Sequence, residues 1–379
     1  MRKEILYMEI KKERNSSLEL LRIICIVLII AHHYGIHGGY EEYTYEAIPS
    51  GWMFIQGISM FGRLACAVFA LISGFFLIHA GKERHYRKLV PLIAAMTFYS
   101  VLINAVCAVT GFGEVTTKMT LRSFFPDFWG NWYVDYYIVF FALIPFLNPM
   151  LTSLSQKRFT QLLIVVYLLW SVLPTFTMQA WEFSRLDFFL VMYMTGAYIR
   201  LYVHGKVKYN NRWNLVVALV SAALIELSVV AFNMLDTVLK TNRFVGSGWY
   251  FSSYNAVPGV IFAVSIFLYF SNLEFHSKPV NLIAGSVIGI YVIHDNALIR
   301  RLIWQTLWPN PAYAAAPYLH ALVKIVSVFV VCLGIDLIRR ATFSKVFDRW
   351  FYKHCDAMWA WIRAKLPGPF KALINREDG

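Results

Sequence analysis

Long apolar segments alternate along the chain with short polar ones, and this alternation predicts a series of membrane-spanning helices. Roughly 18 or more apolar residues in a run suffice to cross a bilayer, and a span must be helical because a lipid-exposed strand would leave backbone groups unpaired. About ten such helices are predicted, so the expected fold is an all-α membrane protein. They cover residues 18–38, 53–80, 89–111, 132–152, 159–178, 186–204, 213–234, 255–272, 283–305 and 317–338.

The last part of the chain follows a different pattern. In ATFSKVFDRWFYKHCDAMWAWIRAKL, aromatic and apolar residues recur at helical spacing with basic residues between them, and LPGP follows at 366–369. This pattern is typical of an amphipathic helix lying in the membrane interface, and a solvated basic tail is the alternative. We therefore expect an integral-membrane domain over residues 1–340 and a cytoplasmic basic amphipathic tail over 341–379.

Composition and charge agree with a membrane protein. Of the 379 residues 58% are hydrophobic and only 15% are charged, whereas about a quarter are charged in a soluble domain. The net charge of +13 comes mostly from loops, because 25 of the 35 Lys and Arg residues lie on one side of the predicted spans and seven on the other. Since cytoplasmic loops are rich in Lys and Arg, both termini are expected in the cytoplasm. The basic balance thus reflects contact with a membrane and indicates no nucleic-acid partner.

The first predicted span, LELLRIICIVLIIAHHYG, carries charged and titratable side chains. Helical residues turn by about 100° each, so Arg22 and His33 share one face, about 16 Å apart along the axis, and Glu19 lies on the same stripe. His32 is rotated by about 80° from it. Such residues within a span are costly and indicate a functional site, and a histidine suits the role of general base. The alternative is that Glu19 and Arg22 only pair at the interface and His33 only bonds a neighbouring helix.

Other polar residues within the spans leave several interpretations open. Arg63 and Asp135 could pair with each other or line the entrance for an acceptor. Trp132 could stack on a sugar or belong to an interfacial aromatic belt. Ser73 and Gly74 could serve close helix packing, and His294 with Asp295 could belong to a site or to the core.

The sequence gives no reason to expect a metal, a disulfide framework or a cleaved signal peptide. His37 follows His33 by four positions, but no acidic or Cys ligand is expected to join them. Four of the five cysteines lie in apolar runs and none forms a CxxC pair. The first apolar segment has no small-residue cleavage site, so the span is expected to be retained.

Several of these segments resemble one known family. RNSSLELLR, with Arg14, Glu19 and Arg22, followed by ten residues and His33, is similar to the opening of the acyltransferase-3 family of bacterial integral-membrane acyltransferases. The resemblance covers roughly residues 14 to 340 and indicates a stand-alone member. Later segments match the family in the same order: AVFALISGFFL at 67–77, RHYRKLVPL at 84–92, NWYVDYYIVFFALIPFLNPML at 131–151 and IGIYVIHDNALIR at 288–300.

Two departures from the family pattern matter. Glu19 stands where the family often has Asp, which keeps the charge. The family's Arg-x-x-Arg pair before the proline corresponds here to His85 and Lys88, or, one residue earlier, to Arg84 and Arg87. Which pair is the counterpart stays open.

The resemblance implies transfer of an acyl group, usually acetyl, from cytoplasmic acetyl-CoA to a hydroxyl of a glycan or related acceptor outside the bacterial cell membrane. The expected catalytic residues are His33, Arg22 and Glu19. The expected CoA-binding residues, which could equally be mere topology determinants, are Arg14, Arg84, Arg87 and Lys88. The expected acceptor-side residues are Arg63, Trp132, Asp135 and His294.

Two other functions compete with this one. A polytopic transporter or permease could use Arg22 and His33 in a proton or substrate pathway. The chain has no internal repeat, which many transporters show, and this counts against a permease. A non-catalytic membrane sensor is the third possibility. Binding and consumption of acetyl-CoA would separate an enzyme from both.

Overall fold

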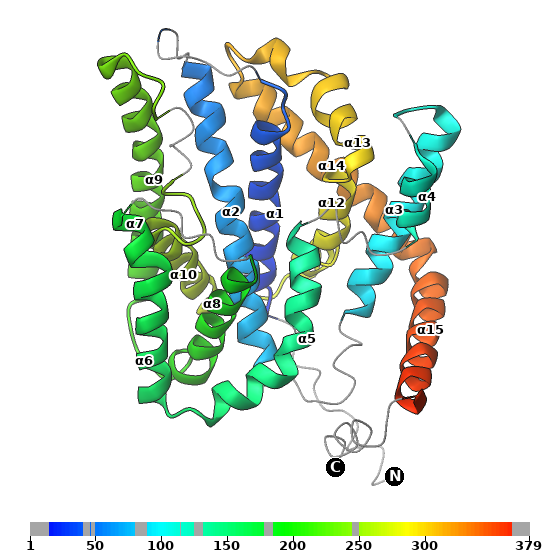
Figure 1. Cartoon of the computed structure of the whole chain (residues 1–379), viewed down its shortest axis with the longest axis horizontal. Coiled ribbons are helices and arrows are strands. Elements are labelled where there is room, and N and C mark those ends of the chain that lie inside the picture. Colours follow the sequence, from blue (N-terminus) through cyan, green and yellow to red (C-terminus); the bar gives the residue numbers. More distant parts are fainter. Residues whose placement is uncertain are drawn as a thin grey trace.

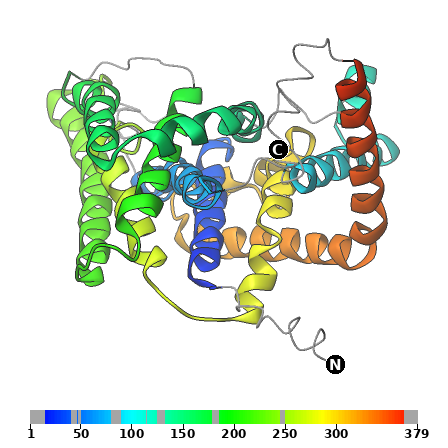
Figure 2. The same cartoon turned by 90° about the horizontal axis from the view of Figure 1, so that it is seen from below.

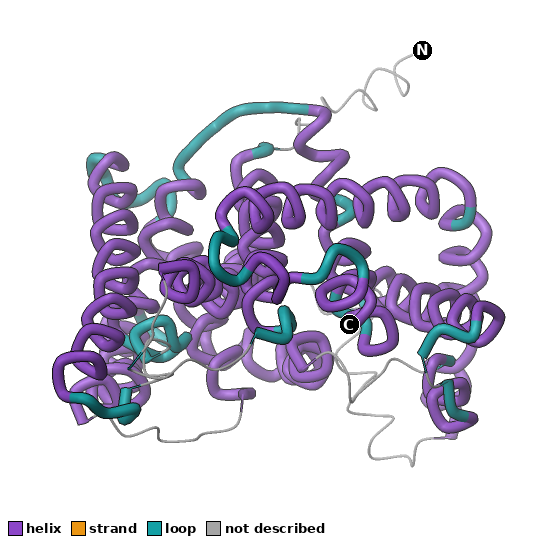
Figure 3. The backbone as a smooth tube through the Cα atoms, turned by 90° about the horizontal axis from the view of Figure 1, so that it is seen from above, coloured by secondary structure: helices purple, strands orange, loops and turns teal. Residues whose placement is uncertain are grey.

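The structure, a computed structural model, describes residues 15–40, 46, 50–79, 89–113, 115–124, 132–177, 185–244 and 250–365. Within these ranges the regular elements are helices and no strand occurs (Figure 3). The α-helices are α1 (Ser17–Ile36), α2 (Ser50–Leu77), α3 (Val90–Thr110), α4 (Thr117–Ser123), α5 (Trp132–Ser153), α6 (Gln156–Tyr167), α7 (Leu173–Thr177), α8 (Arg185–Tyr198), α9 (Asn211–Leu239), α10 (Val257–Ser271), α11 (Lys278–Ala284), α12 (Val287–His294), α13 (Ala297–Arg301), α14 (Tyr318–Thr342) and α15 (Ser344–Lys365).

The predicted spans correspond closely to these helices. Eight helical segments of the described chain are long and apolar enough to cross a membrane, and each matches one predicted span. The prediction for 255–272 corresponds to α10, which is shorter than the other spans. All-α architecture is thus confirmed, and the chain is a multi-pass membrane protein.

The predicted continuous helix over 283–305 is wrong in one respect. The helical segments Lys278–His294 and Ala297–Tyr313 meet at an angle of 75°. The break has a local cause, because α12 ends at His294 and the Asn296 side chain caps the next helix by accepting a hydrogen bond from the Leu298 N–H at 3.0 Å. Irregular backbone at membrane depth is tolerated where it is buried in protein or lines a cavity.

Helix α1 lies in the middle of the molecule. It packs against α2, α10, α11, α12 and α14. Figures 1 and 2 show α1 and α2 between a group of helices that includes α6, α8, α9 and α10 on one side and a group that includes α3, α12, α14 and α15 on the other. Leu21, Ile26 and Ile30 of α1 are almost completely buried, as expected for a helix that is apolar on most of its circumference. Of its polar residues, Ser17, Glu19 and His33 are buried as well, whereas Arg22 is partly exposed.

Two glycines set the closest approach between α2 and α8. A Cβ atom at Gly74 would overlap the carbonyl oxygen of Tyr193, and a Cβ at Gly196 would overlap the carbonyl oxygen of Leu71. Small residues at a crossing let two membrane helices pack backbone against backbone. Gly74 therefore acts as the close-packing residue that one of the sequence interpretations proposed.

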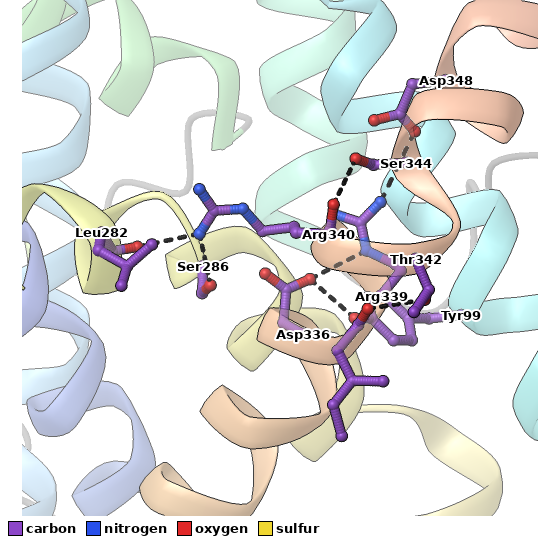
Figure 4. A network of polar contacts seen from close by, with 10 residues as sticks. Tyr99, Leu282, Ser286, Asp336, Arg339, Arg340, Thr342, Ser344 and Asp348 are labelled. Carbon is purple, nitrogen blue, oxygen red and sulfur yellow. Dashed lines mark hydrogen bonds and ion pairs between the residues drawn. The ribbon is translucent and has the colours of Figure 1, made fainter.

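The predicted amphipathic segment of the tail forms α15, which packs against α3 and α14. Figure 4 shows the polar contacts at this junction. Asp336 Oδ1 accepts hydrogen bonds from Tyr99 Oη at 2.7 Å and from Arg339 Nε at 3.0 Å, and Arg339 Nη1 lies 3.6 Å from Asp348 Oδ1 of α15. These contacts join α3, α14 and α15. Val346, Trp350 and Trp361 of α15 are exposed in the isolated chain, and an interfacial position in the membrane stays a prediction for this helix.

Candidate active site

The imidazole rings of His33 and His294 meet between α1 and α12. His33 Nδ1 lies 2.9 Å from His294 Nε2, and His294 Nδ1 lies 2.6 Å from the backbone oxygen of Ile290. A carbonyl oxygen can only accept, so His294 Nδ1 carries a hydrogen. In the neutral rings Nε2 of His294 then accepts the Nδ1–H of His33, which leaves the lone pair of His33 on Nε2. This arrangement suits a general base, and the sequence predicted that role for His33.

Asp295, in the break between α12 and α13, is the charged centre of this group. Its Oδ1 lies 3.7 Å from His33 Nδ1, 3.6 Å from His37 Nε2 and 2.8 Å from Arg300 Nη2. Arg300 also donates to the Asp295 backbone oxygen at 3.0 Å. A buried carboxylate is stable as an anion only when it is paired, and Arg300 supplies the pairing charge. Asp295 can in turn stabilise a positive charge on either histidine.

A cavity of about 380 Å³ lies over this group. Two of the predicted acceptor-side residues, Arg63 and Trp132, line it together with His33. Arg185 lies over the Trp132 ring, with its guanidinium carbon 4.6 Å from the ring centroid. The described residues that line the cavity also include His32, His37, Cys66, Tyr254, Tyr291, Asp295 and Arg300.

The structure corrects two expectations about the histidines. The rotation of His32 by about 80° from the stripe of His33 predicts a ring that faces elsewhere. In the structure His32 also lines the cavity, and its Nδ1 lies 2.6 Å from the Ser59 backbone oxygen. A Cβ at Gly62 would overlap the His32 side chain, so α2 approaches α1 closely enough to hold this ring at the cavity wall. The second correction concerns metal ligands: Asp295 joins His33 and His37, and their ligand atoms lie within 4.8 Å of one another.

This trio has the donor types that a divalent transition metal uses. In the structure, however, the Asp295 oxygen is taken up by the Arg300 guanidinium, and a metal would have to compete with that cation. The arrangement seen here suits charge stabilisation of the histidines better than metal binding.

The other end of the α1 stripe forms a second feature. Arg22 Nη1 lies 3.0 Å from Glu19 Oε2, and Glu19 is 4% exposed. Arg22 lines a second cavity of about 190 Å³, whose walls are mostly apolar and include Ser73 and Tyr137. Both cavities share Ile29, Cys66 and Tyr291 as lining residues, so they adjoin. The two cavities together follow α1 from Arg22 to His37.

The remaining predicted site residues are placed less directly. Asp135 lies in the first turn of α5, and it is not among the described residues that line either cavity. His294 is completely buried and reaches the site through His33. The predicted CoA-binding residues Arg14, Arg84, Arg87 and Lys88 lie outside the described residues.

The sequence interpretation assigned no site role to Arg185, Tyr254, Tyr291 or Arg300. Arg185 and Arg300 were counted only as loop charges. A signal for two of the four existed, because Tyr291 and Arg300 belong to the segment IGIYVIHDNALIR. Tyr254 carries no comparable sequence signal. Burial raises the pKa of its phenol, and the charges of Arg185 and Arg63 lower it in part.

Lys324 of α14 holds the segment that follows α13. Its ammonium donates to the backbone oxygens of Leu307 at 3.0 Å and Trp308 at 2.7 Å. The same segment donates from Gln305 Nε2 to the His37 backbone oxygen and from Asn310 Nδ2 to the Tyr34 backbone oxygen, both at 3.0 Å. Lys324 thus holds in place the segment that follows Arg300 and contacts the end of α1.

Comparison with known proteins identifies the family. The acyltransferase-3 family, described as an acyltransferase domain, matches residues 15–337, which is most of the chain. No curated protein and no solved structure matches this chain. The matched region contains both cavities and every helix of the candidate site. The chain therefore belongs to the acyltransferase-3 family and is a membrane acyltransferase.

Proposed function

We propose that this protein transfers an acetyl group from cytoplasmic acetyl-CoA to a hydroxyl of an extracytoplasmic glycan or related acceptor, in a bacterial cell membrane with both chain termini in the cytoplasm. The observation that carries the proposal is the state of His33. Its Nδ1 is engaged by His294, its Nε2 keeps a lone pair, and the ring borders a cavity large enough for a small-molecule site, for which roughly 300 Å³ is the lower limit.

In the proposed reaction His33, Asp295 and Arg300 each have one role. Nε2 of His33 takes the proton of the acceptor hydroxyl as the oxygen attacks the thioester carbonyl carbon. The new C–O bond forms, the C–S bond breaks, and the leaving thiolate takes the proton back from His33 to give CoA with a free thiol. Asp295, 3.7 Å from His33, would stabilise the imidazolium while it exists, and Arg300 holds the carboxylate ionised.

The donor must reach His33 from within the protein. CoA is too polar to cross lipid, so its thioester arm needs a passage between helices. The second cavity supports such a passage, because it begins at Arg22, has mostly apolar walls and adjoins the cavity of His33. Arg22, held by Glu19, would position the donor at the opposite end of the α1 stripe.

The basic residues near the cytoplasmic end would bind the CoA phosphates. Arg14, Arg84, Arg87 and Lys88 are chemically suited to this contact, since phosphates pair well with clustered guanidinium and ammonium groups. Neutralising Arg84, Arg87 and Lys88 together should raise the KM for acetyl-CoA more than it lowers kcat, and the wild-type KM should rise with salt. An unchanged KM, in protein of verified topology, would leave these residues as topology determinants.

The direct test uses purified protein in nanodiscs with acetyl-CoA and a panel of hydroxyl-bearing glycans. Release of free CoA together with mass-spectrometric detection of the acetyl ester is expected. If the protein neither binds nor consumes acetyl-CoA with any acceptor, the proposal is wrong.

Sealed vesicles test the two-sided arrangement. In inside-out vesicles, acetyl-CoA added outside should acylate a membrane-impermeant acceptor only when that acceptor is trapped in the lumen. Efficient acylation of an impermeant acceptor added on the same side as acetyl-CoA, with vesicles shown to be intact, would exclude transfer across the membrane.

A further inference from the structure

The cavity beside His33 has an uneven charge. Among the described residues, three guanidinium groups line it, from Arg63 of α2, Arg185 of α8 and Arg300 of α13, against one carboxylate, that of Asp295. The histidines that line the same cavity can add positive charge but no negative charge. The described part of the lining therefore favours an anion.

Asp295 does not compensate the charge of Arg185. Its Oδ1 lies 2.8 Å from Arg300 Nη2, 3.6 Å from His37 Nε2 and 3.7 Å from His33 Nδ1. Among the described residues no carboxylate forms an ion pair with Arg185. Its guanidinium group makes a cation–π contact with the Trp132 ring. A guanidinium stacked on an indole is held in place while its N–H groups stay available to a partner.

Arg185 and Arg63 act on the same region of the cavity. Both line it together with Tyr254. Burial raises the pKa of the Tyr254 phenol, the charges of Arg185 and Arg63 lower it in part, and the carboxylate of Asp187 acts in the opposite direction. An anion bound between the two guanidinium groups would be attracted by both charges. Their planar forks match the two oxygens of a carboxylate or of a phosphate diester.

The other lining residues suit a carbohydrate. The rings of Trp132 and Tyr254 lie 6.4 Å apart between centroids and are tilted by 31°, which gives an apolar surface against which the faces of a sugar ring can pack. The volume of about 380 Å³ is in the range of sites for small molecules. His33 borders the same space, so a bound sugar would carry its hydroxyl close to the base.

We propose that the acceptor is an anionic glycan, whose negative group binds between Arg63 and Arg185 and thereby aims a neighbouring hydroxyl at His33. This inference rests on the proposed function, because it concerns the acceptor of that reaction. The anion can be the carboxylate of an acidic sugar or the phosphodiester of a phosphate-linked glycan, and both share the chemistry that the two guanidinium groups recognise.

The test compares matched acceptors in one preparation of the full-length protein. One pair is an oligosaccharide ending in a uronic acid and its carboxyl-reduced neutral form. The other pair is a phosphodiester-linked glycan and the same glycan without phosphate. At least a tenfold higher kcat/KM is expected for the anionic member of one pair, and the pair that shows it identifies the source of the anion. The preference should decrease with salt.

Variants locate the preference. Arg185→Gln should reduce the anionic-to-neutral ratio of kcat/KM to near one, and Arg185→Lys should keep part of it. Arg301→Gln is the matched control, since Arg301 is exposed and is not among the described lining residues, and its ratio should equal that of the wild type. A ratio measured within each preparation is independent of the fraction of folded protein.

Each alternative outcome has a separate meaning. Equal kcat/KM for anionic and neutral acceptors, with acetyl transfer intact, would overturn the inference and leave the proposed function standing. A rise in the KM for acetyl-CoA in Arg185→Gln, with the acceptor preference unchanged, would assign the arginine to the donor and also overturn it. Absence of acetyl transfer to all four acceptors, together with no consumption of acetyl-CoA, would overturn the proposed function and the inference with it.

Discussion

His33 Nδ1 lies 2.9 Å from His294 Nε2 although 261 positions separate the two residues in the chain. The contact joins α1 to α12, the helix that precedes the break in the bent span. It fixes one nitrogen of His33 in a hydrogen bond, and the other keeps its lone pair.

Replacement of His33 by Ala should lower kcat by about 10²- to 10⁴-fold, the usual contribution of a general base. Expression and membrane insertion should stay normal, which detergent-solubilised size-exclusion chromatography would show. His32→Ala is the neighbouring control: this ring lines the cavity but is bonded to the Ser59 oxygen, so the loss should be smaller. Near-wild-type kcat in His33→Ala would show that another group is the base.

His294 is a positioning residue, because it acts on the reaction through His33. His294→Phe removes the acceptor of the His33 Nδ1–H and should lower kcat while leaving the KM for acetyl-CoA nearly unchanged. His294→Gln, whose side-chain oxygen can accept the same hydrogen bond, should recover part of the rate. A purely structural role predicts no such recovery, and equal activity of the two variants would argue for it.

Arg22→Lys keeps the charge at the start of the α1 stripe but loses the planar fork that contacts Glu19 at 3.0 Å. We expect reduced kcat/KM for acetyl-CoA in an assay of CoA release. Arg212→Lys in α9, an exposed position, should leave it unchanged. A fully active Arg22→Lys enzyme would reduce Arg22 to an interfacial charge.

Lys324→Met should destabilise the fold, because the carbonyl oxygens of Leu307 and Trp308 lose their shared donor. Both hydrogen bonds are partly buried, and a hydrogen bond of this kind contributes about 0.5–1.5 kcal/mol. Thermal unfolding in detergent, followed by tryptophan fluorescence, should show a lower Tm, and Lys208→Met at an exposed position should show none of this decrease. An unchanged Tm would mean that other contacts hold this segment.

Local features of the sequence predicted the helices and their polar faces well. The eight long helices follow from the length of apolar segments, and the shared face of Glu19 and Arg22 follows from the helical period. The break at Asp295 was missed, because one capping asparagine inside a long apolar segment is a weak local signal.

Non-local features could not be predicted in this way. That Asp295 joins His33 and His37 depends on how distant helices pack, which no local period encodes. Arg185 and Arg300 followed the pattern of loop charges, and only the three-dimensional arrangement brings their guanidinium groups to the cavity of His33. Spacing along one helix reveals a shared face, but it does not reveal which other helix meets that face.

The close crossing of α2 and α8 bears on acceptor selection at a distance. Arg63 lies eleven positions from Gly74, and Arg185 lies eleven positions from Gly196. Eleven helical residues make three turns plus about 20° and a rise of about 16 Å, so each arginine lies on the face of its helix that carries the glycine. The interhelical angle at the glycines therefore sets the gap between the two guanidinium groups, and a change of roughly 5° alters that gap by about 1.4 Å. The crossing at Gly74 and Gly196, about three helical turns deeper in the membrane, would then determine the size of the anion that fits between the two arginines, although neither glycine contacts it.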